Sequence, residues 1–168
     1  VALGIPSRQR LGAAIARHGI DADQLVCEVT ETAAMEDTQA MTRVLEELGA
    51  LGVELSIDDF GTGYSNLAKL RRMRAHELKI DREFVADVAR DADARAVVDA
   101  IVRLGHALGL RIVAEGVETD AQRDVLRELG CDELQGYYFA RPLPPEALLA
   151  DEVHSTDGGG AVGFSPSV

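Results

Sequence analysis

The sequence predicts an α/β fold with parallel strands, and two observations lead to this prediction. Strand-like stretches begin near residues 25, 53, 77, 111 and 133, and a helical pattern follows each of them. This alternation indicates a parallel sheet with right-handed crossovers. Periodicity alone leaves open a (β/α)8 barrel or a doubly wound sheet. Charged residues near the carboxyl ends of four strands favour the barrel, because a barrel collects such residues at one mouth.

The composition limits the class of protein. The 168 residues fit one domain, and a hydrophobic fraction of 46% is enough for a buried core. The formal charge of −12, without a cluster of basic residues, argues against nucleic acid and anionic membrane surfaces as partners. Cys27 and Cys131 have no CxxC spacing, which is typical of reduced thiols in a cytoplasmic protein.

The ends of the chain suggest a part of something longer. No apolar run approaches the ~18 residues of a membrane span, and no leader sequence opens the chain. Because the first residue is Val1 rather than Met, we expect a piece of a longer protein, in which any membrane anchor lies outside this chain.

Helices are predicted where apolar residues recur at intervals of three and four. The longest such pattern, Asp93 to Leu108, is apolar on one face and ends before Gly109. Ser65 is a suitable N-cap for the third helix, in which we expect Leu67 and Leu70 to be buried. In chain order the predicted helices are 11–18, 37–49, 65–73, 84–88, 93–108, 120–129 and 142–149.

Strands are predicted where apolar and polar residues alternate, over residues 25–31, 53–58, 77–81, 111–115 and 133–135. Residues 1–9 contain a short apolar stretch that we interpret as the remnant of a further strand. Beyond Ser155 the chain is rich in Gly, Ser and Pro and has no periodicity. We therefore expect a partial barrel domain over residues 1–150 and a flexible tail over 151–168.

Charged residues share one face near the carboxyl ends of these strands. Because side chains alternate along a strand, parity places Glu28, Asp58, Lys79 and Glu115 away from the apolar, helix-covered side. Asp59 adjoins Asp58, and adjacent carboxylates raise one another's pKa unless a cation lies between them. A divalent metal is the simplest such cation. The alternative is that these are separate surface charges.

Five segments of the chain follow one another in an order typical of a known family. They are Cys27 to Thr32, Ile57 to Ser65, Leu78 to Asp81 with Phe84, Ala114 to Thr119, and Gln135 to Phe139 ahead of Pro142-Leu143. These segments resemble the signatures of the EAL-domain cyclic di-GMP phosphodiesterases. The resemblance extends over roughly residues 11–149. It implies a modified (β/α)8 barrel that hydrolyses cyclic di-GMP to linear pGpG with two Mg²⁺ or Mn²⁺ ions.

The resemblance also implies a role for each matching residue. Glu28, Asp58 and Asp59 resemble the family's metal ligands. Lys79 resembles the lysine that contacts the nucleophilic water or the phosphate, and Glu115 the general base or second-metal contact.

The remaining matches support the site. Glu31 resembles the glutamate that braces the loop after the paired aspartates. Asp81, Glu118 and Gln135 match positions in the acidic site and in the network of ligand and water.

The chain departs from the family pattern at its front. No Glu-Ala-Leu segment precedes the matching motifs, where the family's first strand lies, and the chain's one asparagine, Asn66, follows the loop instead of ending a second strand. A barrel of this type has about 250 residues, so we expect an incomplete one with about five or six of its eight βα units. Its open strand edges would favour a homodimer.

Three hypotheses remain from the sequence. The chain is the C-terminal portion of a phosphodiesterase domain, inactive alone; or it is a degenerate EAL module that binds cyclic di-GMP or a protein partner without hydrolysis. The third is an ordinary α/β domain without this activity.

Overall fold

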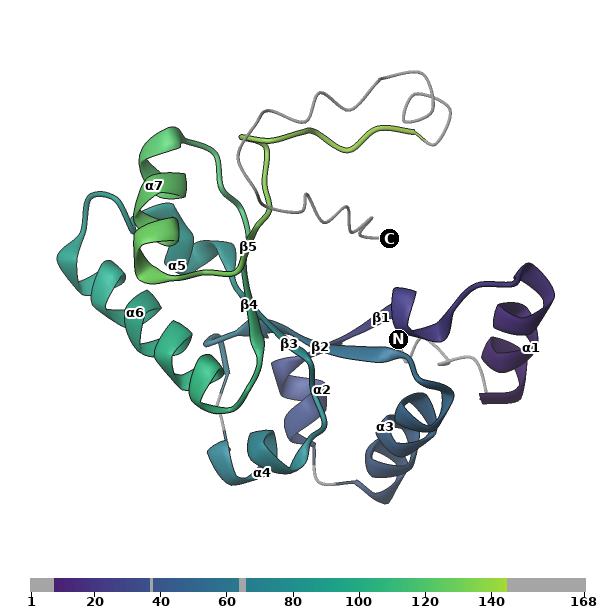
Figure 1. The fold of residues 1–168 in the computed structure, drawn as a ribbon. Helices are drawn as coiled ribbons and strands as arrows, with labels where there is room; N and C mark the ends of the chain where they lie inside the picture. Colours follow the sequence, from purple (N-terminus) through teal and green to yellow (C-terminus); the bar gives the residue numbers. More distant parts are fainter. Residues whose placement is uncertain (1–7, 37, 64–65, 145–168) are drawn as a thin grey trace. The chain divides into compact units, whose positions relative to one another are not determined.

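The computed structural model describes residues 8–36, 38–63 and 66–144. These residues form two compact units, one within Val1–Lys79 and Ala107–Leu110, the other within Ile80–His106 and Arg111–Val168. In both units strands and helices alternate along the chain, as the colours of Figure 1 show.

The first unit is built on neighbouring parallel strands. Its elements are α1 (Arg8–His18), the 3-10 helix η1 (Ala22–Gln24), β1 (Val26–Thr30), α2 (Glu31–Met35), α3 (Gln39–Leu51), β2 (Glu54–Phe60), α4 (Leu67–Arg72) and β3 (Glu77–Ile80), whose last residue belongs to the second unit. The strands are hydrogen-bonded in the order β1-β2-β3. β1 and β2 pair in parallel, with Val26 opposite Glu54 and Thr30 opposite Asp58.

Apolar side chains between the strands and helices hold the first unit together. One buried cluster consists of Val29, Ala34 and Leu55, from β1, α2 and β2. Burying a Val or Leu side chain contributes about 1.5–3 kcal/mol relative to leaving it exposed. The cluster therefore fixes α2 against the strands, next to the ends that carry the candidate site.

The second unit has the same alternation. Its elements are α5 (Arg82–Ala86), α6 (Ala92–Ala107, whose last residue belongs to the first unit), β4 (Arg111–Ala114), α7 (Asp120–Leu129) and β5 (Glu133–Leu134). β4 and β5 pair in parallel, with Ala114 opposite Leu134. Gly105 of α6 lies so close to Ile112 that a Cβ at this position would overlap the isoleucine side chain. α6 thus packs directly on β4.

The predicted parallel strands are all present, and the differences lie at their ends. β1 ends at Thr30, not Glu31, because Thr30 is the N-cap of α2 and its Oγ1 accepts a hydrogen bond from the Ala33 amide at 3.4 Å. α2 was not predicted. β2 continues to Phe60, two residues beyond its predicted end at Asp58.

The predicted start of α4 was wrong. Its N-cap is Asn66, whose Oδ1 accepts from the amides of Ala68 and Lys69 at 3.1 and 3.2 Å. Ser65, the predicted cap, lies outside the described residues. Leu70 is buried as expected, but Leu67 is 51% exposed.

Some predictions lie wholly or partly outside the described residues. They concern the strand remnant within 1–9, the tail over 151–168 and most of the helix over 142–149; Pro142 to Pro144, which are described, are not helical. No helix in the described part of the chain is both long and apolar enough to cross a lipid bilayer.

Candidate active site

Three charged side chains meet on neighbouring strands of the first unit. Nζ of Lys79, on β3, donates to Oε1 of Glu28, on β1, at 2.7 Å, and lies 3.2 Å from Oδ1 of Asp58, on β2. The Lys79 side chain is only 4% exposed, and those of Glu28 and Asp58 are 28% and 22% exposed. The ammonium therefore lies between two carboxylates, largely shielded from water.

The strand register explains this meeting. Glu28 is opposite Ser56 and Thr30 is opposite Asp58, so Glu28 and Asp58 have the same parity on adjacent parallel strands and point to one face. Two buried side-chain atoms have no hydrogen-bond partner among the described residues: Oδ1 of Asp58 and Oγ of Ser56. A buried polar atom without a partner costs about 1–3 kcal/mol. For Asp58 the ammonium of Lys79 offsets part of this cost.

Asp59 has an unusual backbone conformation. Its φ is +54°, in the left-handed region that few residues with a side chain adopt. Its carbonyl oxygen accepts from Oγ1 of Thr62 at 2.9 Å, which closes the turn that follows the strand. Such strained residues cluster at active sites, where the surrounding structure holds them.

Glu31 fixes the backbone of this turn. It is the first residue of α2, its exposed fraction is 1%, and its Oε2 accepts from the amides of Gly61 and Gly63 at 2.9 and 3.1 Å. A Cβ at Gly63 would lie 3.4 Å from the Glu31 carboxyl group, so the loop approaches the carboxylate closely. Glu31 thus contacts the loop after the paired aspartates, and its role as a brace for the active site stays a prediction.

The other predicted site residues belong to the second unit. Glu115 directly follows β4, is half-buried, and donates from its amide to the Ile80 carbonyl at 3.1 Å. Asp81 is the N-cap of α5, with its Oδ1 accepting from the Glu83 amide at 2.7 Å. Glu118 is exposed.

Gln135, the last of these residues, joins the segment after β4 to the segment after β5. Its amide donates to the Ala114 carbonyl at 2.8 Å, and its carbonyl accepts from the Val117 amide at 3.0 Å. These contacts are made by its backbone.

Burial affects the two cysteines in the same direction. Burial, with a smaller contribution from the neighbouring Glu28 carboxylate, raises the pKa of the Cys27 thiol. Burial, followed by the charge of Asp132, raises the pKa of Cys131 to about 12. Both cysteines are free, and both stay protonated near neutral pH, so neither offers a thiolate to a metal.

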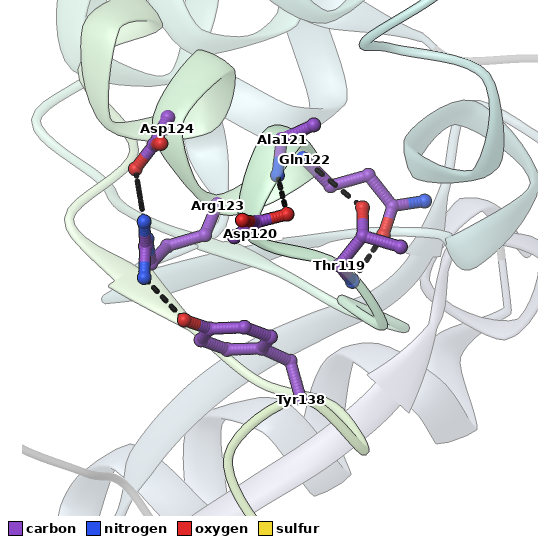
Figure 2. A network of polar contacts seen from close by, with 7 residues as sticks. All are labelled: Thr119, Asp120, Ala121, Gln122, Arg123, Asp124 and Tyr138. Carbon is purple, nitrogen blue, oxygen red and sulfur yellow. Dashed lines mark hydrogen bonds and ion pairs between the residues drawn. The ribbon is translucent and has the colours of Figure 1, made fainter.

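The sequence prediction missed Gln122, a buried side chain in the first turn of α7. Thr119 and Gln122 form a capping box, in which Oγ1 of Thr119 accepts from the Gln122 amide at 3.2 Å and Oε1 of Gln122 accepts from the Thr119 amide at 3.0 Å (Figure 2). Nearby, Arg123 contacts both Asp124 and the Tyr138 hydroxyl. The spacing Thr-x-x-Gln ahead of a helix was the sequence signal for the capping box.

Parallel strands that end in carboxylates and a lysine define a class of α/β proteins whose sites lie at the carboxyl ends of their strands. Within that class the chain belongs to the EAL domain family, whose sequence model matches residues 7–142. The predicted resemblance is confirmed.

Two relatives come from Pseudomonas aeruginosa. The bifunctional diguanylate cyclase/cyclic di-GMP phosphodiesterase MucR is 55% identical over 137 residues, which are 82% of this chain and 20% of MucR. The cyclic di-GMP phosphodiesterase NbdA is 47% identical over 135 residues, which are 80% of this chain and 17% of NbdA. The chain thus spans a fifth or less of the length of these relatives.

Solved structures agree with the family. The MucR phosphodiesterase in complex with cyclic di-GMP is similar with a TM-score of 0.81 and 50% identity, over 87% of this chain and 59% of that one. The EAL domain of Mycobacterium smegmatis DcpA has a TM-score of 0.80 and 32% identity, over 89% of this chain and 67% of that one. The predicted fold class, an incomplete α/β barrel of the EAL type, is confirmed.

Divalent ions are present in another relative. Klebsiella pneumoniae BlrP1 was solved with cyclic di-GMP and either calcium or manganese, at TM-scores of 0.75 and 0.76 and identities of 37% and 36%. The calcium complex matches 80% of this chain and 34% of that one, and the manganese complex 83% and 36%.

The letters Glu-Ala-Leu do occur in this chain, as Glu146-Ala147-Leu148. They lie after the last matching motif and beyond residue 142, where the family match ends. They therefore do not take the place of the segment from the family's first strand.

Proposed function

We propose that this chain supplies part of the active site of an EAL domain that hydrolyses the bacterial second messenger cyclic di-GMP to linear pGpG. The observation that carries this proposal is the position of Lys79 between Glu28 and Asp58 at the ends of neighbouring strands. The names of MucR and NbdA, and the cyclic di-GMP bound in the MucR structure, support the choice of substrate.

Mg²⁺ or Mn²⁺ is the cofactor that we propose. The donor chemistry fits, because Glu28, Asp58 and Asp59 offer the hard carboxylate oxygens that these ions prefer. Oδ1 of Asp58 is buried, and among the described residues it has the ion pair with Lys79 but no hydrogen bond. When bound, the ions supply a Lewis acid that activates water and offsets the charge of the phosphodiester. Within the described ranges no group of three or more His, Cys, Asp or Glu side chains is gathered around one point. Further ligands would come from the substrate or from residues outside these ranges.

The protein groups have separate tasks in this proposal. We assign Lys79 to the attacking water or a phosphate oxygen, because a positioned ammonium stabilises charge that develops on the phosphorane. Glu115 accepts the proton of the attacking water as a general base, or contacts the second metal ion. Asp81, Glu118 and Gln135 belong to the surrounding network of ligand and water.

Glu31 acts on the shape of the site. Its bonds to the amides of Gly61 and Gly63 hold the turn after the aspartate pair. The strained backbone at Asp59 is kept by this turn, so Glu31 supports the aspartates without touching the substrate.

A binding module without hydrolysis is the second candidate. It is favoured by the position of the Lys79 ammonium, whose single positive charge lies against both carboxylates and offsets part of the charge of Glu28 and Asp58. In that case cyclic di-GMP or a protein partner would bind and remain unchanged.

Product analysis separates the two candidates. The natural protein that carries these residues is incubated with cyclic di-GMP and Mn²⁺, and the nucleotides are separated by chromatography. Conversion to pGpG that stops when the metal is chelated supports hydrolysis. Binding of cyclic di-GMP, measured by calorimetry, without any pGpG supports the binding module. A protein that neither binds nor converts cyclic di-GMP would contradict both candidates.

Location and assembly complete the proposal. A cytoplasmic site of action agrees with the free Cys27 and Cys131, because thiols persist in reducing compartments. A homodimer would cover an open strand edge of the barrel, and sedimentation analysis of the chain tests it.

A further inference from the structure

Gln122 is a buried amide whose hydrogen-bonding groups are all used. Its exposed fraction is 7%. Oε1 accepts from the amides of Glu118 and Thr119 at 2.9 and 3.0 Å, and Nε2 donates to the carbonyls of Ala86 and Val85 at 3.0 and 3.4 Å. A side-chain amide offers two lone pairs and two N–H donors, so its capacity is filled. Gln122 thereby joins the end of α5 to the segment 115–119.

The segment 115–119 carries the predicted catalytic Glu115. Its backbone path is fixed by four amides, two of which donate to Gln122; of the others, Glu115 donates to Ile80 and Val117 to Gln135. Between them, Gly116 has a φ of +70° and lies against Arg82, where a Cβ would overlap the arginine side chain. The segment thus has little freedom as long as the bonds to Gln122 are made.

We propose that Gln122 is a positioning residue for Glu115, which holds the segment 115–119, and with it the Glu115 carboxylate, in the place that hydrolysis requires. The inference rests on the proposed function for its catalytic part. Its structural part, the fixation of the segment by Gln122, stands on the hydrogen bonds alone.

An amide suits this position better than a carboxylate. A glutamate at residue 122 would keep an oxygen for the amides of Glu118 and Thr119. It would also place a charged oxygen against the carbonyls of Val85 and Ala86, in a site from which water is largely excluded. Gln122→Glu therefore keeps the hydrogen bonds to the segment 115–119 and removes those to α5, so it distinguishes the effects of the two sets.

The capping box provides a matched control. Gln122→Met keeps the length of the side chain and removes all four bonds, whereas Thr119→Val removes the other half of the same capping box and leaves the bonds of Gln122 to the segment in place. Both variants weaken the start of α7. Only the first releases the segment.

The experiment compares these variants in the natural protein that carries the chain. We expect Gln122→Met to lower kcat for cyclic di-GMP about 10- to 100-fold with little change in KM, because a displaced general base acts on the chemical step. We expect Thr119→Val to keep kcat within about threefold of wild type, and Gln122→Glu to recover part of the loss. Equal kcat values for Gln122→Met and wild type, or equal losses in Gln122→Met and Thr119→Val, would overturn the proposal.

Amide hydrogen exchange makes the test independent of turnover. In this chain Gln122→Met should speed exchange at residues 118 and 119, and Thr119→Val should leave the Glu118 amide protected. Unchanged protection in Gln122→Met would overturn the positioning role. A wild-type protein without turnover would contradict the proposed function and leave the exchange result to decide whether Gln122 fixes the segment.

Discussion

The charged ammonium group of Lys79 is almost completely buried. Its contacts with Glu28 and Asp58, at 2.7 and 3.2 Å, offset part of the cost of desolvating that charge. The three groups therefore depend on one another, and a change at one of them alters the balance of charge for all.

Lys79→Met is expected to destabilise the metal-free chain by about 2–4 kcal/mol, because two shielded carboxylates lose their shared cation. Urea denaturation measures the change. The control is Arg95→Met, which removes an exposed ion pair to Glu128 with side chains 39% and 69% exposed. Its expected cost is below about 1 kcal/mol. Equal costs for the two variants would contradict the account of Lys79.

Mn²⁺ should partly replace the missing ammonium. In Lys79→Met the carboxylates of Glu28 and Asp58 lose the ammonium that lies between them, so added Mn²⁺ should raise the melting temperature more than it does in the wild type. Calorimetric melting with and without the ion gives the two shifts. A smaller shift in the variant would show that the ion does not bind at this pair.

Glu31→Ala is expected to cost about 1–3 kcal/mol, because the amides of Gly61 and Gly63 lose their acceptor. Chemical denaturation measures this loss. Glu47→Ala, on the exposed face of α3, is the control and should change stability by less than about 0.5 kcal/mol. If both variants are equally stable, the loop does not depend on Glu31.

The ends of the helices and strands of this chain are set by local hydrogen bonds, such as those of the capping residues. The long helices were predicted well because their apolar spacing is clear: α7 begins at Asp120 and ends at Leu129, as expected. α2 was missed because it has five residues, too few for a periodic pattern. Because Thr30 is the N-cap of α2, the helix begins at Glu31, and the predicted first strand, which included Glu31, was too long.

The turn between α7 and β5 holds the second free cysteine, and its reactivity can be predicted. With a pKa of about 12, Cys131 has little thiolate at pH 8. We expect native alkylation by iodoacetamide to be about 100-fold or more slower than in the unfolded chain. Mass spectrometry in buffer and in guanidinium measures the ratio. Rapid modification of Cys131 in the native protein would contradict its burial.

The same thiol affects stability at alkaline pH. Because its folded pKa is raised above the unfolded value, the native state keeps a proton that the unfolded state loses. The contribution of the Cys131 thiol to the free energy of unfolding is constant below the pKa of the unfolded state, near 9. It declines as the pH rises toward 12.

At the scale of the whole chain, the sequence was enough to predict the family and the strand ends that carry Glu28, Asp58 and Lys79. Strand parity is a local property, and parallel strands bring like parities to one face. The sequence also predicted Lys79 as the single cation among these carboxylates. It did not predict the direct contacts of the ammonium with Glu28 and Asp58, because the reach of Lys79 depends on the register of three strands. It did not predict Gln122 either, since its bonds to α5 join residues 36 and 37 positions apart.

The chain by itself should show little or no Mn²⁺-dependent conversion of cyclic di-GMP. The family resemblance implies two further metal ligands, the glutamate of the first-strand Glu-Ala-Leu segment and an asparagine of the second strand, and neither lies in the matching region of this chain. Product chromatography of the isolated chain tests this expectation. Robust turnover would contradict it and would mean that the residues present are sufficient.

The central claim is that Glu28, Asp58 and Lys79 form a reaction centre. The most direct test is the rate of pGpG formation with Mn²⁺ by the natural protein that carries these residues, compared with its Asp58→Asn variant and with Asp99→Asn on α6 as a control. We predict turnover in the wild type, a loss of about 100-fold or more in Asp58→Asn, and an unchanged rate in the control. Equal rates in the wild type and Asp58→Asn would contradict the account.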